Sequence, residues 1–238
     1  MKWPIHKTLL LLILFIFTYG IGLFPLIFFL KFLFTLNLNN LIHLLSLPFL
    51  LILGFIIFVL GEVFSTGLIA RIFRYKEGNF KLNMDDPNTF KWLVYQTIYY
   101  PFGYFLYSLT VEPLKALHLR LCGAKIGNEV NVGGFIADPC LFEVGGNTTI
   151  GGFCEILGHS AERGKFIVKK VKIGKNCLVG EFSLILPGVR MEDGSILCAN
   201  SLANKNKVLK EGKVYVGTPA RQIKKMILLE KRKQLDAT

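Results

Sequence analysis

The chain has 238 residues, of which 52% are hydrophobic and only 18% are charged, and its formal net charge is +12. Soluble domains usually carry about 25% charged residues, so the composition excludes a disordered chain and argues against a wholly soluble one. A basic excess in an apolar chain points to an anionic membrane surface, a nucleic acid or a phosphate-bearing ligand. The charges follow no nucleic-acid-binding motif, and we therefore expect no nucleic-acid partner.

Residues 1–70 contain two long segments without charge, over residues 8–30 and 41–60. As helices, both are long enough to cross a bilayer core of about 30 Å. The turn between them carries no Lys or Arg, whereas basic residues lie before the first segment and directly after the second. The positive-inside rule predicts a transmembrane hairpin in the cytoplasmic (inner) membrane, with everything after residue 70 in the cytoplasm. A signal peptide is the alternative for the first segment, but it shows no small-residue cleavage site.

Residues 71–122 form a linker of different character. Asp86 and Pro87 make a good helix start, because Asp suits the N-cap and Pro the first helical position. Tyrosine and other aromatic residues crowd the stretch from 92 to 107, with almost no charge among them. Such a density of Tyr favours helices that lie in the membrane interface and contact the lipid bilayer. A soluble core helix is the alternative, because it shares this pattern.

A six-residue repeat begins at Ile126-Gly127 and also obeys a period of eighteen. Ile126 is followed eighteen residues later by Val144, and Val179 by Leu197. Each hexapeptide is then one flat strand of a three-sided coil, three units complete a turn, and the aliphatic residue points inward. Gly and Asn suit the corners, since they accept left-handed backbone angles. A β-sandwich would not keep the eighteen-residue register.

This pattern resembles the left-handed parallel β-helix of the hexapeptide-repeat acyltransferases. The resemblance implies a mainly β transferase domain over residues 123–222, its left-handed winding, and assembly into a homotrimer of prisms. Residues 223–238 follow as a basic C-terminal helix or tail. The repeat breaks once, after Ile156, where about eleven extra residues lie within 158–170. A loop thrown out of a regular prism is where function tends to concentrate.

His159 opens that loop and is the only histidine in the repeat. In the family that it resembles, a histidine beside such a loop acts as general base, and histidine suits proton transfer near neutral pH. A merely packing or capping histidine is the alternative. Asp138, Glu143 and Glu155 are the carboxylates closest in register, and the sequence does not choose among them. We take Asp138 and Glu155, with His159, as the catalytic candidates.

The later repeats suit a thioester cofactor. Small side chains at Ala199 and Ser201 leave room for a pantetheine arm, and Lys205, Lys207 and Arg221 are cations that suit its phosphates. The ending Gly217-Thr-Pro-Ala-Arg resembles that of family members which use coenzyme A. The alternative is a basic tail on the anionic leaflet. There is no C-x-x-C pair among the five cysteines, so we expect buried thiols and no metal.

A second resemblance covers both halves of the chain. The segments LKALHLRLCGAKIG (114–127) and LILPGV (184–189) resemble the membrane-bound C-terminal repeats of poly-lysine-synthetase-type peptide synthetases. We therefore predict a membrane-anchored acyltransferase, with acetyl the expected group. It would move the group from acyl-coenzyme A to a hydroxyl or amine of a small-molecule or lipid-linked acceptor. The alternatives are an aminoacyl or peptidyl thioester on a carrier protein as donor, or a catalytically inactive β-helix scaffold.

Overall fold

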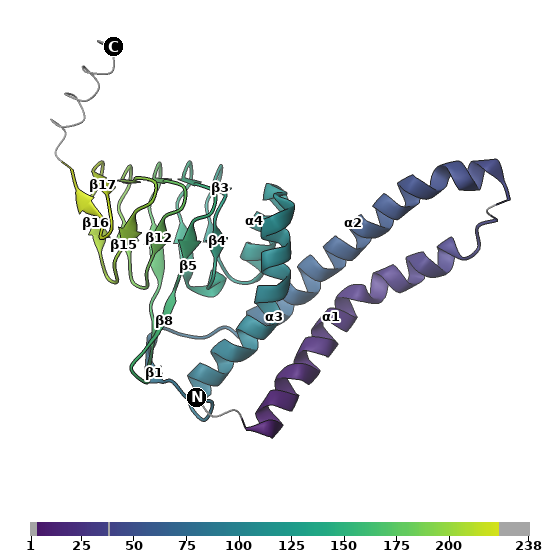
Figure 1. Cartoon of the computed structure of the whole chain (residues 1–238), viewed down its shortest axis with the longest axis horizontal. Coiled ribbons are helices and arrows are strands. Elements are labelled where there is room, and N and C mark those ends of the chain that lie inside the picture. Colours follow the sequence, from purple (N-terminus) through teal and green to yellow (C-terminus); the bar gives the residue numbers. More distant parts are fainter. Residues whose placement is uncertain (1–3, 38, 224–238) are drawn as a thin grey trace, which may run out of the picture.

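A computed structural model describes residues 4–37 and 39–223, so most of the predicted tail over 223–238 lies outside the described residues. A β-helix and a pair of long helices lie on opposite sides of two shorter helices (Figure 1). The long helices are α1 (Ile5–Leu33) and α2 (Leu41–Ile72). The shorter ones are α3 (Pro87–Leu109) and α4 (Glu112–Leu121).

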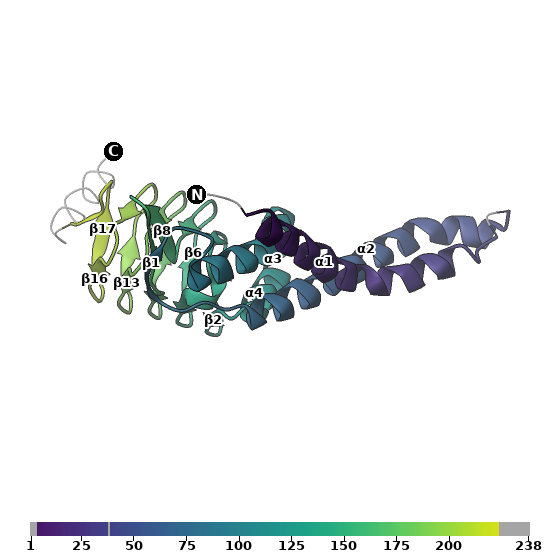
Figure 2. The same cartoon turned by 90° about the horizontal axis from the view of Figure 1, so that it is seen from below.

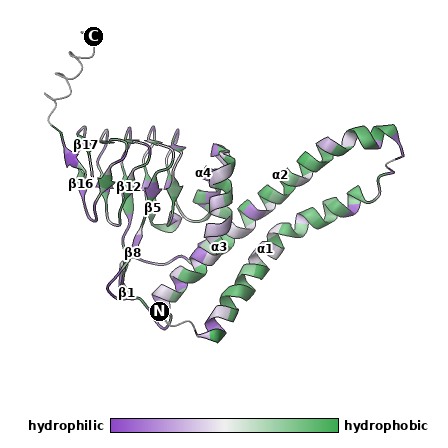
Figure 3. Ribbon diagram, viewed as in Figure 1, coloured by the Kyte–Doolittle hydropathy of each residue, from purple (hydrophilic) through white to green (hydrophobic). Residues whose placement is uncertain are grey.

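Helices α1 and α2 lie side by side and extend away from the β-helix (Figure 2). Most of their residues are hydrophobic (Figure 3), and large side chains such as Ile13, Phe28 and Phe49 are exposed. Both are long and apolar enough to cross a membrane. The two backbones approach closely at Gly61, because this residue has no side chain. A Cβ built on Gly61 would lie 2.1 Å from the carbonyl oxygen of Gly22. Any larger side chain at Gly61 would force the two helices apart.

Helix α3 begins where the sequence predicts. Asp86 is its N-cap and accepts hydrogen bonds from the backbone N–H groups of Asn88 (2.8 Å) and Thr89 (3.2 Å). Tyr95 and Tyr99 of this helix are buried in the protein, whereas Tyr104 is exposed. The Tyr99 hydroxyl donates to the carbonyl of Ile136 at 2.7 Å. Helix α3 therefore packs on the first coil of the β-helix.

Three parallel sheets form the sides of the β-helix, and each is named here by its first strand. The β2 face contains β2 (Lys125–Ile126), β5 (Phe142–Val144), β10 (Val171–Ile173), β13 (Arg190–Met191) and β16 (Val208–Leu209). The β3 face contains β3 (Asn131–Val132), β6 (Thr149–Ile150), β11 (Leu178–Val179), β14 (Ile196–Leu197) and β17 (Val214–Val216), with β18 (Arg221–Gln222) antiparallel at its end. The β4 face contains β4 (Phe135–Ile136), β7 (Glu155–Ile156), β12 (Leu184–Ile185) and β15 (Leu202–Ala203).

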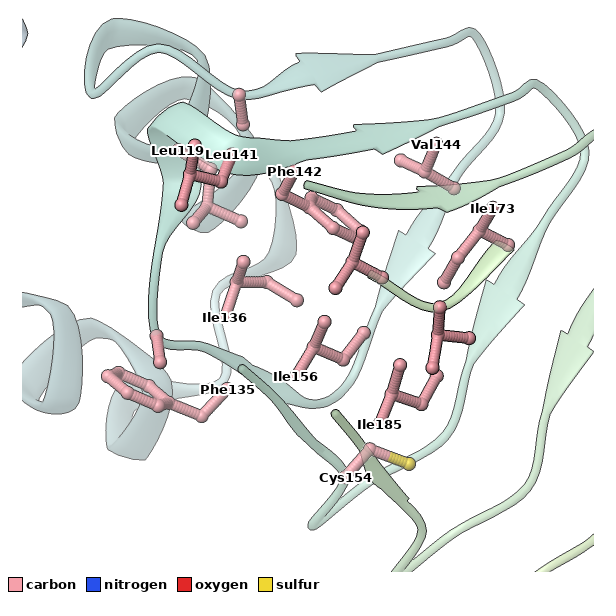
Figure 4. Packing of buried hydrophobic residues seen from close by; sticks show 14 of the residues in the cluster. Leu119, Phe135, Ile136, Leu141, Phe142, Val144, Cys154, Ile156, Ile173 and Ile185 are labelled. Atoms are coloured by element: carbon pink, nitrogen blue, oxygen red, sulfur yellow. The ribbon is translucent and has the colours of Figure 1, made fainter. Parts of the chain in front are cut away.

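The strand register confirms the eighteen-residue period. Ile126 pairs with Val144, and Val179 pairs with Leu197. The aliphatic residues of the repeat point inward and stack into one core, which Figure 4 shows for Ile136, Ile156 and Ile185. Full burial of such a side chain contributes roughly 1.5–3 kcal/mol, so the stacked rows hold the coils together.

Asparagine fills several corners, as the sequence predicts: Asn147, Asn176, Asn200 and Asn206 all have positive φ. Two corners carry phenylalanine instead, Phe153 (φ 57°) and Phe182 (φ 59°). A bulky residue in the left-handed region is strained. The two rings nevertheless stack face to face, with centroids 4.9 Å apart, and both are exposed.

The eleven extra residues form an antiparallel hairpin of β8 (His159–Glu162) and β9 (Lys165–Val168). Strand β1 (Gly78–Lys81), which the sequence did not predict, pairs with β9. The loop is therefore a small three-stranded sheet, ordered β1-β9-β8, that joins the linker to the β-helix. This sheet fixes the position of His159 at the start of β8.

Candidate active site

Asp138 occupies the site because the first coil departs from the repeat. Ile136 pairs with Ile156, twenty residues later, whereas the other two sides of that coil keep the spacing of eighteen. Strand β4 comes two residues early, because Val132 and Ile136 are four residues apart whereas Ile150 and Ile156 are six apart. The corner after β4 is longer by the same two residues, so the coil keeps its total of eighteen, and the short helix η1 (Pro139–Leu141) forms in this corner. The side chain of Asp138, just before η1, is thereby turned inward and is only 1% exposed.

His159 and Asp138 are joined by hydrogen bonds. Nδ1 of His159 lies 2.8 Å from Oδ2 and 2.9 Å from Oδ1 of Asp138. A carboxylate only accepts hydrogen bonds, so Nδ1 carries the ring proton and donates a hydrogen bond to Asp138. Nε2 then holds the lone pair, and it makes no hydrogen bond within residues 4–37 and 39–223. The His159 side chain is 16% exposed, so the pair leaves a basic nitrogen available.

Three further groups orient the carboxylate. The backbone N–H of Gly158 donates to Oδ2 at 2.6 Å, and the amide of Gln96 donates to Oδ1 at 3.1 Å. The hydroxyl of Tyr75 also donates to Oδ1. Burial, followed by the negative charge of Asp138, raises the pKa of Tyr75 well above its usual value. The hydroxyl therefore stays protonated and remains a donor.

Aromatic rings fix the imidazole from one side. The ring of Trp92 lies 4.9 Å from that of His159, and the ring of Phe166 lies 5.9 Å away. Trp92 and Gln96 stand one helical turn apart on α3, so a single face of this helix contacts both members of the pair. Sequence reasoning missed Tyr75 and Gln96. For Gln96 the sequence did offer a signal, namely a single Gln one helical turn after Trp92 in an otherwise apolar helix.

The other carboxylates lie apart from His159. Glu155 is exposed on β7, and no ion pair or hydrogen bond joins it to His159 in the described part of the chain. Glu143 faces Lys125, with its carboxylate 3.1 Å from the ammonium. The structure thus brings Asp138 to His159 and leaves Glu143 and Glu155 elsewhere.

The candidate cofactor residues take different positions. Lys205 forms an ion pair with Glu162 on β8, the strand that begins with His159. The ammonium of Lys207 lies 5.9 Å over the ring of Tyr215. Ser201 is buried, and its hydroxyl donates a hydrogen bond to the backbone carbonyl of Ala199 at 3.3 Å. Ala199 is exposed. Arg221 is exposed on β18.

The cysteines and the histidines give no metal site in the described ranges. The five thiols are free, and Cys122, Cys154 and Cys177 are buried. Within residues 4–37 and 39–223, no three His, Cys, Asp or Glu side chains come together as a metal would require.

Two curated proteins share sequence with this chain. "Putative acetyltransferase YvoF" of Bacillus subtilis is 28% identical over 146 residues, which cover 56% of this chain and 83% of YvoF. Delta-poly-L-ornithine synthetase of Acinetobacter baumannii is 25% identical over 119 residues. That match covers 50% of this chain but only 9% of the synthetase. No protein-family model matches the chain.

A hexapeptide-repeat acetyltransferase of Vibrio cholerae is among the similar solved structures. It is 17% identical, with a TM-score of 0.46, over 54% of this chain and 89% of that chain. The chain resembles the hexapeptide-repeat acyltransferases. The curated relative YvoF, named as a putative acetyltransferase, confirms the resemblance that the sequence repeat indicates.

Proposed function

We propose that the chain is a membrane-anchored acyltransferase in which His159 is the general base. The observation that carries this proposal is the His159–Asp138 pair, in which a buried carboxylate holds the imidazole by Nδ1. Proton transfer by a positioned histidine typically contributes about 10²–10⁴-fold to a rate. Asp138 is itself fixed by three donors, so the pair is preorganised for this task.

The transfer proceeds by attack of an acceptor hydroxyl or amine on the carbonyl carbon of an acyl thioester. Nε2 of His159 takes the acceptor proton while the new C–O or C–N bond forms. The C–S bond then breaks, and the imidazolium returns the proton to the leaving thiolate. Asp138 stabilises the transient positive charge on the imidazole. The products are the acylated acceptor and a free thiol.

The donor that we propose is an acyl-coenzyme A, with acetyl the expected group. Its phosphates would meet Lys205, Lys207 and Arg221, and its pantetheine arm would pass the exposed Ala199, whereas the buried side chain of Ser201 does not face it. The ion pair between Lys205 and Glu162 supports this assignment, because it connects the later coils to the His159 strand. A carrier-bound aminoacyl or peptidyl thioester is the second candidate donor, favoured by the similarity to the ornithine synthetase.

The membrane attachment rests on α1 and α2. Their length and exposed apolar surface support two membrane spans, and the distribution of basic residues favours a cytoplasmic β-helix in the inner membrane. Anchoring would bring the site to a membrane-near acceptor. The left-handed winding and a homotrimer remain part of this proposal. The exposed stack of Phe153 on Phe182 supports a protein contact at that corner.

Radiolabelled acetyl-coenzyme A tests the proposal when it is incubated with native membrane extract and the purified full chain. We expect label to enter a lipid or saccharide fraction with the wild type and not with His159→Ala. The fraction that takes up label identifies the class of acceptor. Equal labelling by both proteins would refute His159 as the base. No labelling by either, without binding of coenzyme A in calorimetry, would favour the carrier-bound donor or the inactive scaffold.

A further inference from the structure

A groove of about 750 Å³ follows the outer side of the β2 face, away from the His159–Asp138 pair. Its floor is a row of charged side chains on neighbouring parallel strands. Lys125 is in register with Glu143, Glu143 with Lys172, and Lys172 with Arg190. Arg120, from the last turn of α4, closes one end of the groove.

Positive charge in this groove exceeds negative charge. Glu143 is its one carboxylate among the lining residues and contacts Lys125 at 3.1 Å, Lys172 at 3.5 Å and Lys170 at 3.6 Å. Burial alone would raise the pKa of Glu143, but the hydrogen bond from Lys125 and the nearby lysine charges outweigh it and hold the pKa below its usual value. A single anion therefore faces three lysines.

The two arginines add further positive charge to the groove. Among the described residues, Arg120 donates to the backbone carbonyls of Ile126 (3.3 Å) and Gly127 (3.1 Å), which are neutral. Arg190 makes no ion pair within the described ranges 4–37 and 39–223. Glu192, two positions along the chain from Arg190, is engaged by Lys210 at 3.3 Å.

The charges of the neighbouring Lys172 and Arg190 repel each other, and this repulsion by itself destabilises the fold. Adjacent parallel strands lie about 4.8 Å apart, so the two cations start from directly opposed positions. Like charges opposite each other destabilise a sheet. An anion bound between them would remove this repulsion, and the planar guanidinium group fits two oxygens of a phosphate.

The groove begins beside the end of α2. A Cβ on Gly67 would lie 2.7 Å from Cβ of Leu121, the residue after Arg120. A Cβ on Gly123 would lie 2.9 Å from Cδ of Arg74, just beyond α2. Figure 2 shows α4 and β2 next to this end of α2. If α2 crosses the membrane, Arg120 and the groove lie at the depth of the lipid headgroups.

We propose that the β2-face groove binds a phosphate group, and that a phospholipid headgroup at the membrane surface presents it. The proposal rests on the proposed membrane attachment and is independent of acyl transfer. Lys172 and Arg190 would hold the phosphate, with Arg120 on the membrane side. A lipid bound there would orient the β-helix relative to the leaflet and hold lipid-linked acceptors near the protein.

Native mass spectrometry of the full chain in detergent measures this binding directly. The probes are phosphatidylglycerol and a monoglucosyl diacylglycerol with the same acyl chains, which has no phosphate. The groove variant is Lys172→Gln with Arg190→Gln. The matched control is Lys165→Gln with Lys213→Gln, which removes two exposed cations that do not line the groove. No acyl donor is present, so a failure of the proposed enzyme activity cannot alter this result.

The wild type should prefer phosphatidylglycerol, and the groove variant should lose affinity for it by about tenfold or more. The control should keep its affinity, and binding of the neutral glycolipid should not change in any protein. Displacement by inorganic pyrophosphate would show that the groove recognises phosphate itself, whereas resistance to it would assign the lipid as the source. Unchanged affinity in the groove variant, or an equal loss in the control, would overturn the proposal.

Discussion

The imidazole of His159 and the carboxylate of Asp138 lie 2.8 Å apart, although the two residues belong to different coils of the β-helix. Asp138 is placed by the lengthened corner after β4 in the first coil, and His159 by the hairpin that leaves the second. Two separate departures from one regular repeat therefore meet at one point. Helix α3 covers that point with Trp92 and Gln96.

Asp138→Asn should lower kcat for acyl transfer by at least about 100-fold, because an amide no longer balances the imidazolium charge. Glu155→Gln should leave kcat near the wild-type value, since Glu155 does not contact His159. Steady-state kinetics with acetyl-coenzyme A check both variants, and thermal unfolding verifies that both are folded. Equal loss in the two variants would mean that Asp138 has no special role.

Tyr75→Phe removes one donor to Asp138 and leaves the aromatic ring in place. A hydrogen bond to a charged group contributes about 1.5–3 kcal/mol, so kcat should fall by roughly tenfold or more while KM for the donor stays unchanged. Tyr100→Phe is the control, since its ring lies in the same aromatic cluster. A rise in KM at constant kcat would instead indicate a role in binding.

Buried His118 is expected to make the folding stability of the protein depend on pH. Burial lowers its pKa to about 3, and its Nε2 lies 2.9 Å from the hydroxyl of Thr66, which donates to the carbonyl of Glu62. The unfolded chain takes up this proton near pH 6.5, whereas the folded protein does so only near pH 3. Stability should therefore fall as the pH decreases from about 6.5 towards 3.

Thermal unfolding in detergent at several pH values between 7.5 and 4.5 measures this effect. Each pKa unit corresponds to about 1.4 kcal/mol, so the loss contributed by His118 should amount to a few kcal/mol at the acid end. His118→Gln should reduce the slope of stability against pH, because the variant has no group to protonate there. An identical slope in both proteins would contradict the prediction.

Phe182→Asn tests the proposed homotrimer. The other corners show that Asn accepts a positive φ, so the substitution should relieve strain of about 1 kcal/mol and should not unfold the chain. Light scattering in detergent should give the mass of three protomers for the wild type and a smaller mass for the variant. Glu129→Asn, at another positive-φ position, is the control. A wild-type mass of one or two protomers would defeat the trimer.

The repeat was predictable from the sequence because each inward residue recurs at a fixed spacing that only stacked coils require. Ile126 and Val144, for example, are both aliphatic and pair in the structure. Position 159 was also predictable, since a break in a regular repeat is visible without any structure. The start of α3 followed from Asp86 and Pro87 in the same way, because N-caps are local features.

The environment of Asp138 was not predictable from the sequence alone. Tyr75 lies 63 residues before Asp138 in the chain, and Gln96 lies 42 residues before it. Nothing local in the sequence encodes these two long-range hydrogen bonds. Strand β1 was missed because its partner β9 lies in the inserted loop. The sequence did not separate the buried Tyr95 and Tyr99 from the exposed Tyr104, because amphipathic helices that face lipid and helices that face protein share one pattern.

In the proposed mechanism, His159 and Asp138 act as one unit in acyl transfer. The most direct measurement is a double-mutant cycle, in which kcat/KM for acetyl transfer is compared among the wild type, His159→Ala, Asp138→Ala and the double variant. Residues that act as a unit lose activity non-additively. We predict that the double variant is no slower than His159→Ala alone. Losses that multiply, or wild-type activity in His159→Ala, would contradict the account.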